Sequence, residues 1–242
     1  MKKLISFVLA LCVCLALCAC GGSSQSSAPA PAAKAESTPV PTPEPTPEPT
    51  PEPAALLPLE IKEFGWSLSG DYLYYAFIFH NPNESTCIEY PKFRITARDD
   101  AGILLGSEEQ TLCISYPGQD AAYGFMAFKV DAVPADVQIE YLDPSEYNVK
   151  DVSMVKVPDY KPLQVVNHAL RDKKIVGEVQ SENDVEFFSV AVSVLFRDDD
   201  GALLGGTTTF VDKVNKGLTP FELSIYEKFA TENYEIWAQP WM

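Results

Sequence analysis

Apolar and polar residues alternate along several short segments of the chain, which predicts β-strands. In residues 92–98 (KFRITAR) every second residue is apolar, and residues 190–196 (VAVSVLF) repeat the alternation. A period of two places successive side chains on opposite faces of a strand, so each segment should bury one face. No apolar stripe with the 3.6-residue period of a helix extends over a useful length in residues 59–242. The chain is therefore predicted to be all-β.

Two nine-residue stretches show that the chain contains an internal repeat. Residues 98–106 (RDDAGILLG) and 197–205 (RDDDGALLG) match at seven of nine positions and lie 99 residues apart. Each stretch follows an alternating segment and ends in an acidic turn closed by glycine, which is typical of a β-hairpin. In such a turn the first Asp accepts backbone hydrogen bonds and Gly takes the left-handed conformation. A repeat of this length corresponds to a whole domain.

The repeat predicts two small domains joined by a connector. We expect the first domain at residues 59–143, the connector at 144–158 and the second domain at 159–242. Each domain has roughly seven short segments with strand composition, separated by turns at the spacing of a β-sandwich. The 99-residue offset also aligns Val137 with Ile236. The two domains should therefore share one fold.

The order of these elements is similar to that of a known family. Strand, Asn-containing turn, alternating strand, D-x-x-G hairpin and Gly turn resemble the FxLYD family, which consists of small immunoglobulin-like domains of prokaryotic surface proteins. Both predicted domains carry the pattern, although Arg98 and Arg197 stand where the family has an aromatic residue before the Asp. The resemblance implies two tandem immunoglobulin-like β-sandwich domains after a disordered Pro-rich stalk. It implies fold and location more than function, because the family's activity is largely undefined.

The first residues have the organisation of a signal peptide. Two lysines are followed by the apolar segment 4–17 and then by Leu-Cys-Ala-Cys at residues 17–20. A run this short is typical of a signal peptide and not of a membrane span. Leu17-Cys18-Ala19-Cys20 resembles the lipobox of bacterial lipoproteins, which implies cleavage after residue 19 and a diacylglycerol on Cys20. The alternative is a soluble secreted protein cut near Ala19.

Residues 20–58 are predicted to be a lipid-anchored linker. Every second residue from Pro39 to Pro53 is proline, which excludes both helix and sheet. A polyproline II conformation would let the linker span on the order of 100 Å, so it could lift the domains through a cell wall. Alternatives are a Pro-rich ligand for another protein and a stalk glycosylated on Thr42, Thr46 and Thr50.

The charge balance limits the choice of partners. The formal net charge is −16, and because residues 1–19 carry two lysines and no acidic residue, the remaining chain has a charge of −18. Such acidity argues against binding of nucleic acid or of anionic lipid head groups.

No motif in the sequence predicts catalysis, a cofactor or a strong metal site. HExxH, GxSxG, P-loop and CxxC patterns are absent, and His80 and His168 stand apart from any nucleophile pattern. Asp198, Asp199 and Asp200 could bind calcium, but consecutive side chains at a hairpin tip point in different directions, which favours a solvated turn. Four aromatic residues could form a sugar platform, although core positions are the favoured interpretation: Trp66, Tyr72, Tyr74 and Tyr75.

Cys87 and Cys113 are predicted to form a disulfide. If the hairpin turn is centred between Asp100 and Ala101, facing residues have numbers that add up to about 201, so the two cysteines should lie opposite each other. Export would also place them where disulfides persist. The alternative is two reduced cysteines acting as small apolar residues, and Pro91 weakens the pairing between the turn and Cys87.

Together these features predict a non-catalytic lipoprotein of the bacterial cell membrane that faces the extracytoplasmic side. It would act as a binding or interaction module, attached to the membrane by its lipid. The expected partner is another envelope protein or a cell-wall polymer. A structural scaffold of an envelope complex is the alternative, and an enzyme is the least favoured class.

Overall fold

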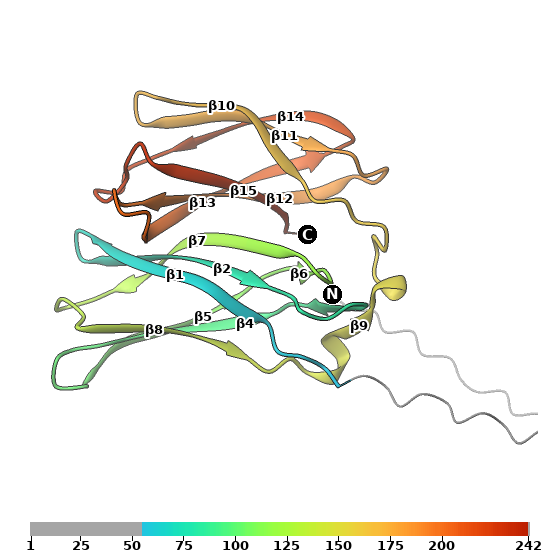
Figure 1. Ribbon diagram of the computed structural model, residues 1–242. Helices are drawn as coiled ribbons and strands as arrows, with labels where there is room; N and C mark the ends of the chain where they lie inside the picture. The colour runs from blue at the N-terminus through green and yellow to red at the C-terminus, as the bar shows by residue number, and fades with distance from the viewer. Residues whose placement is uncertain (1–54, 242) are drawn as a thin grey trace, which may run out of the picture. The chain divides into compact units, whose positions relative to one another are not determined.

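The computed structural model describes residues 55–241 and confirms the all-β prediction (Figure 1). The expected signal peptide, Cys20 and nearly all of the Pro-rich linker lie outside the described residues. Within the described range, none of the helices has the length and apolar character needed to cross a membrane.

The first half of the described chain forms a sandwich of two three-stranded antiparallel sheets. One sheet has the order β1 (Glu60–Ser69), β2 (Tyr72–His80), β7 (Asp120–Lys129). The other has the order β5 (Leu104–Thr111), β4 (Lys92–Arg98), β8 (Asp136–Leu142). A small third sheet at one end contains β6 (Ile114–Ser115), β3 (Thr86–Glu89) and β9 (Val149–Asp151), followed by the short 3-10 helix η2 (Val152–Met154). The predicted connector thus supplies β9, preceded by the 3-10 helix η1 (Glu146–Asn148), to the first sandwich.

The second half of the described chain repeats this arrangement. One sheet has the order β10 (Gln164–Arg171), β11 (Lys174–Ser181), β14 (Gly217–Ser224). The other has the order β13 (Leu203–Val214), β12 (Phe187–Arg197), β15 (Tyr234–Pro240). In both halves the first, second and penultimate long strands form one sheet, and the third, fourth and last form the other.

The repeated hairpin is the same in both sandwiches down to its hydrogen bonds. Ile95 pairs with Glu108, and 99 residues later Val194 pairs with Thr207. At the tip, one carboxylate oxygen of Asp99 accepts two backbone N–H groups at 3.0 and 2.8 Å, and Asp198 does the same at 3.0 and 2.8 Å. The arginine before each Asp donates to the carbonyl oxygen of the turn glycine, which gives this position a role that an aromatic side chain could not fill.

The last strand departs from the 99-residue offset. Val137 pairs with Ala97, whereas Ile236 pairs with Val194, the counterpart of Ile95. The predicted match of Val137 with Ile236 is therefore wrong by two residues. A shift of two residues leaves every side chain on the same face, so the apolar pattern cannot reveal it. The exact domain boundaries remain a prediction, because the described residues group into a single compact unit.

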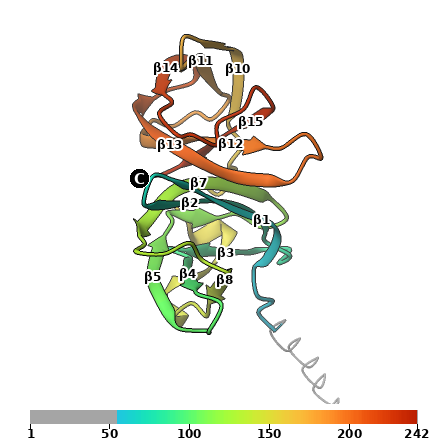
Figure 2. The ribbon, with the colours of Figure 1, turned by 90° about the vertical axis from the view of Figure 1, so that its left-hand side faces the viewer.

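The two sandwiches pack face to face, so that four sheets are stacked (Figures 1 and 2). Sheet β1-β2-β7 of the first sandwich lies against sheet β13-β12-β15 of the second. Glycines make this approach possible: a Cβ on Gly124 would lie 2.5 Å from the Cα of Gly206, and one on Gly65 would lie 1.9 Å from the carbonyl oxygen of Leu203. Ala76 is fully buried beside them. At these positions only glycine lets the two backbones meet.

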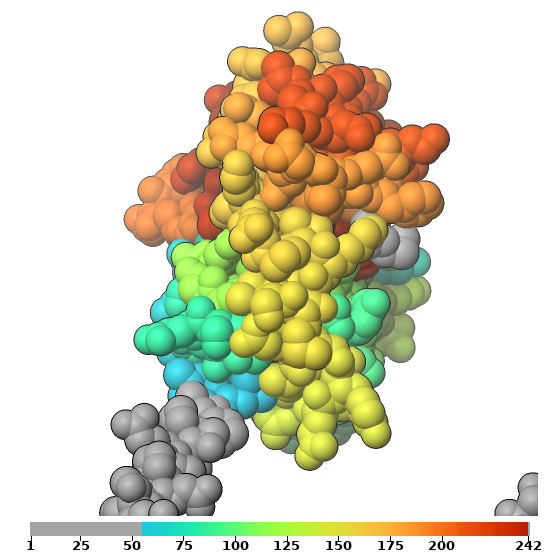
Figure 3. Space-filling model, turned by 90° about the vertical axis from the view of Figure 1, so that its right-hand side faces the viewer, coloured from blue at the N-terminus to red at the C-terminus, as the bar shows by residue number. Residues whose placement is uncertain are grey.

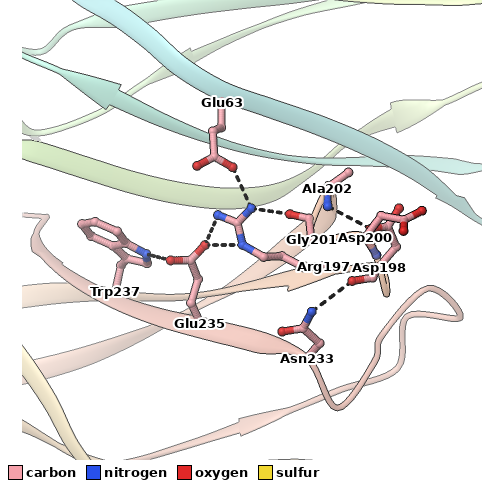
Figure 4. Close-up of polar contacts among 9 residues, drawn as sticks. All are labelled: Glu63, Arg197, Asp198, Asp200, Gly201, Ala202, Asn233, Glu235 and Trp237. Carbon is pink, nitrogen blue, oxygen red and sulfur yellow. Dashed lines mark hydrogen bonds and ion pairs between the residues drawn. The ribbon is translucent and has the colours of Figure 1, made fainter.

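Polar groups join the two sandwiches around the glycine contact. The hydroxyl of Thr208 donates to the carbonyl oxygen of Gly124 at 2.7 Å and lies 2.7 Å from the hydroxyl of Ser193. The guanidinium of Arg197 lies between Glu63 of the first sandwich, at 2.7 Å, and Glu235 of the second (Figure 4). Such a partly exposed ion pair contributes about 1 kcal/mol or less, so the packing of the glycines dominates.

We predict that Gly124→Ala destabilises the protein by about 3 kcal/mol, because the nearest atoms to the added methyl group belong to the backbone of Gly206 and Thr207 and cannot rotate away. Gly118→Ala is the control. Gly118 has φ +66° with open space around it, so the same substitution should cost only about 1 kcal/mol of backbone strain. Urea unfolding of the full chain measures both. The glycine contact would lose its importance if Gly124→Ala were no more destabilising than the control.

Candidate functional site

A cleft of about 380 Å³ opens where the end of the first sandwich, the connector and the second sandwich meet. Figure 3 shows the connector crossing from one sandwich to the other on this side of the molecule. Four aromatic residues and one cysteine dominate its walls: Tyr90, Tyr116, Phe187, Trp241 and Cys113. This junction cleft is within the size range of ligand pockets, at its lower end.

The cleft forms where the first hairpin is interrupted. In the second sandwich β12 and β13 are single strands that keep one register from the Phe187–Val214 pair to the turn region. In the first, the corresponding hairpin is divided into β3 and β4 at Tyr90-Pro91, and into β5 and β6 at residues 112–113. Pro91 has no N–H to donate, so a strand is weakened at this point.

Tyr90 adopts an unusual backbone conformation at the rim of the cleft. Its φ is +53°, and its N–H donates to the carbonyl oxygen of Cys113 at 2.7 Å. Its side chain remains 57% exposed. A non-glycine residue in the left-handed region costs about 1–2 kcal/mol, and such strain tends to occur at functional sites.

The remaining walls come from both sandwiches and are held by aromatic packing. The ring of Tyr116 stacks on that of Tyr160 with centroids 4.1 Å apart, and Tyr160 packs edge-on against Phe187. The backbone N–H of Trp241 donates to the carbonyl oxygen of Ser189 at 2.9 Å. Its ring lies 6.0 Å from that of Phe125 in the first sandwich. The cleft therefore depends on the two sandwiches being held together.

Charged groups flank this apolar surface. Glu89 ends β3, Glu186 precedes β12, and Lys156 belongs to the connector. Burial raises the pKa of the Cys113 thiol to about 11; the Glu89 carboxylate also raises it, and Lys156 opposes this. Burial likewise raises the pKa of Tyr116. The thiol is therefore protonated at neutral pH and is a poor nucleophile.

A second hollow of about 370 Å³ adjoins the junction cleft and shares Lys156 and Val157 with it. One wall contains Asn183, whose side-chain amide bonds both the N–H and the C=O of Lys161 at 2.8 Å. Asn83 forms the same pair of bonds with Leu57 in the first sandwich, at 2.9 Å each. In each sandwich an Asn side chain thus holds the entering segment of the chain by two hydrogen bonds to its backbone.

The two cysteines do not face each other, and both are free thiols. Arg98 pairs with Leu104 across a five-residue turn segment, followed by a bulge, whereas the prediction assumed a two-residue turn. The register is shifted accordingly, so Tyr90 and not Cys87 lies opposite Cys113. The prediction that the cysteines face each other is wrong, and the structure contains no bridge between them.

The acidic turn at Asp198, Asp199 and Asp200 uses its first carboxylate to accept turn N–H groups. In residues 55–241 no group of three or more His, Cys, Asp or Glu side chains is arranged to hold a metal ion. His80 lies 2.6 Å from Asp120, and the His168 ring packs edge-on against Tyr234.

The four aromatic residues considered as a sugar platform have different environments. Tyr75 is fully buried in the first core, and Trp66 packs against the same core. Tyr74 packs against Phe229 of the second sandwich with ring centroids 5.5 Å apart. Tyr72 is 44% exposed. The core interpretation therefore holds for Tyr75 and Trp66.

No known family model matches this chain, and a search of curated proteins finds no similar sequence. The resemblance to FxLYD domains and to lipoproteins therefore stays a prediction. Sequence reasoning also missed the junction cleft. The available signals were Tyr90-Pro91, which interrupts one copy of the repeat and not the other, and the aromatic residue Trp241 after the last strand.

We predict that Cys87 and Cys113 react slowly with iodoacetamide in the folded protein at pH 8. Burial raises the pKa of each thiol to about 11, so alkylation should be on the order of 100-fold slower than that of a free cysteine. The rate at Cys113 should rise about tenfold per pH unit until its pKa is reached. Mass spectrometry of the full chain measures each site, with urea-denatured protein as the control. A Cys87–Cys113 cross-linked peptide, or a rate equal to that of the denatured control, would contradict this account.

Proposed function

We propose that this protein is a non-catalytic lipoprotein that binds an extracytoplasmic partner in the junction cleft. The observation that carries the proposal is the convergence of both sandwiches and the connector on one aromatic-lined hollow. A strained, exposed Tyr90 at the rim of this hollow supports a binding role. The partner is an envelope protein or a cell-wall polymer.

The lipid anchor is part of the same proposal. The lipobox-like Leu17-Cys18-Ala19-Cys20 supports acylation of Cys20, and the Pro-rich linker would hold the cleft away from the membrane surface. Two acyl chains on one cysteine are sufficient for stable attachment. Mass spectrometry of membrane-extracted protein tests the anchor. An unmodified Cys20 in the membrane fraction would remove this part of the proposal.

A structural scaffold in an envelope complex is the second candidate. The close contact of Gly124 with Gly206 favours it, because it makes the two sandwiches one body that could position other proteins. A scaffold would not require the junction cleft to be open. The two candidates therefore differ in whether aromatic residues of the cleft matter for binding.

We predict that Tyr90→Asn reduces retention of the full-length protein on the envelope of its host by about tenfold or more. Asn tolerates the left-handed backbone at this position, so the variant should remain folded while losing the aromatic ring. Tyr226→Asn is the matched control, because Tyr226 is 83% exposed and lies outside the junction cleft. The wild type and both variants carry Cys20→Ala, so that no acyl chains hold them in a membrane, and they are applied separately to purified cell wall and to envelope membranes. Circular dichroism confirms folding of both variants.

Retention that falls only for Tyr90→Asn supports the binding proposal, and the fraction involved identifies the partner as wall polymer or membrane protein. Equal retention of the wild type and both variants would reject the cleft as the binding site and favour the scaffold.

A further inference from the structure

The chemistry of the junction cleft restricts what can enter it. Besides its aromatic rings, the lining contains aliphatic and proline side chains, including Ile114, Val157 and Pro240. Two carboxylates, Glu89 and Glu186, and one ammonium group, that of Lys156, are the charged groups at its edge. A volume of about 380 Å³ lies at the lower end of the range for ligand pockets and is sufficient for a single aromatic ring or side chain.

We propose that the junction cleft takes an aromatic side chain of an extended peptide, flanked in that peptide by lysine or arginine. The inference rests on the proposed function and names the chemistry of its partner. The aromatic ring would be buried among apolar and aromatic side chains, the environment in which rings contribute most to binding. The flanking cations would lie beside Glu89 and Glu186, which come from opposite sides of the junction.

Charge complementarity supports a cationic partner. The two carboxylates outnumber the single lysine at the cleft, and the whole chain has a formal charge of −16. An anionic polymer would be repelled both locally and at long range, whereas a basic peptide would be steered toward the protein. In the described chain no salt bridge occupies Glu89 or Glu186, so both carboxylates can pair with a ligand.

A peptide fits the cleft better than a neutral sugar for two reasons. A sugar ring carries hydroxyls on every side, and an apolar floor would leave several of them buried without a partner. An extended peptide can also use the strand edge at the cleft. Within the described residues, β6 pairs only with β3, and Ile114 of this edge strand lines the cleft. Unpaired strand edges are common docking sites for extended peptides.

Isothermal titration of the full-length protein in detergent tests the inference with four probes. They are the end-blocked tripeptides Lys-Phe-Lys, Lys-Ala-Lys and Glu-Phe-Glu, and the neutral trimer of N-acetylglucosamine. Lys-Phe-Lys should bind at least tenfold more tightly than each of the others, and its affinity should fall with added salt.

Variants separate the contribution of the cleft from that of net charge. The double variant Glu89→Gln, Glu186→Gln should weaken Lys-Phe-Lys binding by about tenfold. Glu146→Gln with Glu232→Gln removes the same charge from exposed positions outside the cleft and should leave affinity unchanged.

Four outcomes would overturn the inference: no binding of Lys-Phe-Lys, equal binding of Glu-Phe-Glu, equal weakening by the two double variants, or tighter binding of the sugar. Each of them leaves the proposed function standing if envelope retention still depends on Tyr90. Loss of that dependence would instead reject the proposed function itself.

Discussion

The contact between the backbones of Gly124 and Gly206 is the constraint on which the rest of the structure depends. Packed sheets usually lie about 10 Å apart because side chains fill the space between them. Here the added Cβ of an alanine would meet backbone atoms at 2.5 Å, so the two central sheets touch where side chains are absent. Around this point Thr208 and Arg197 supply polar links between the sandwiches. Two similar domains thereby become a single four-layered body, and the junction cleft exists because of it.

The differences between the two copies of the repeat locate the site. Both hairpins share register, turn bonds and the arginine that caps the turn glycine, so these features belong to the fold. Only the first copy breaks its strands at Tyr90-Pro91, and the break faces the cleft. The second copy contributes the uninterrupted strand that begins at Phe187. The two copies thus keep one architecture while only the first contributes interrupted strands to the junction cleft.

The sequence was informative where periodicity and turn chemistry determine structure. Alternation predicted the strands, and the D-x-x-G stretches predicted both hairpins. The alternation of apolar and polar residues looks the same after a shift of two residues, which is why the predicted match of Val137 with Ile236 was wrong. The predicted hairpin register was wrong because it assumed a two-residue turn. The prediction that Cys87 and Cys113 face each other depended on this register and was therefore wrong as well. The interface was hidden because Ala191 and Ser193 have the composition of a solvated face, although both are buried. The absence of charged residues at Ala191, Ser193 and Leu195 was the available clue.

Residual dipolar couplings of the full chain in solution test the central claim most directly, because they report the orientation of each sandwich relative to a common alignment axis. The close packing of the central sheets predicts that couplings from both sandwiches fit one alignment tensor with the orientation seen in the structure. Two tensors of different magnitude or orientation would show that the sandwiches move independently, and the account of the junction cleft would then be contradicted.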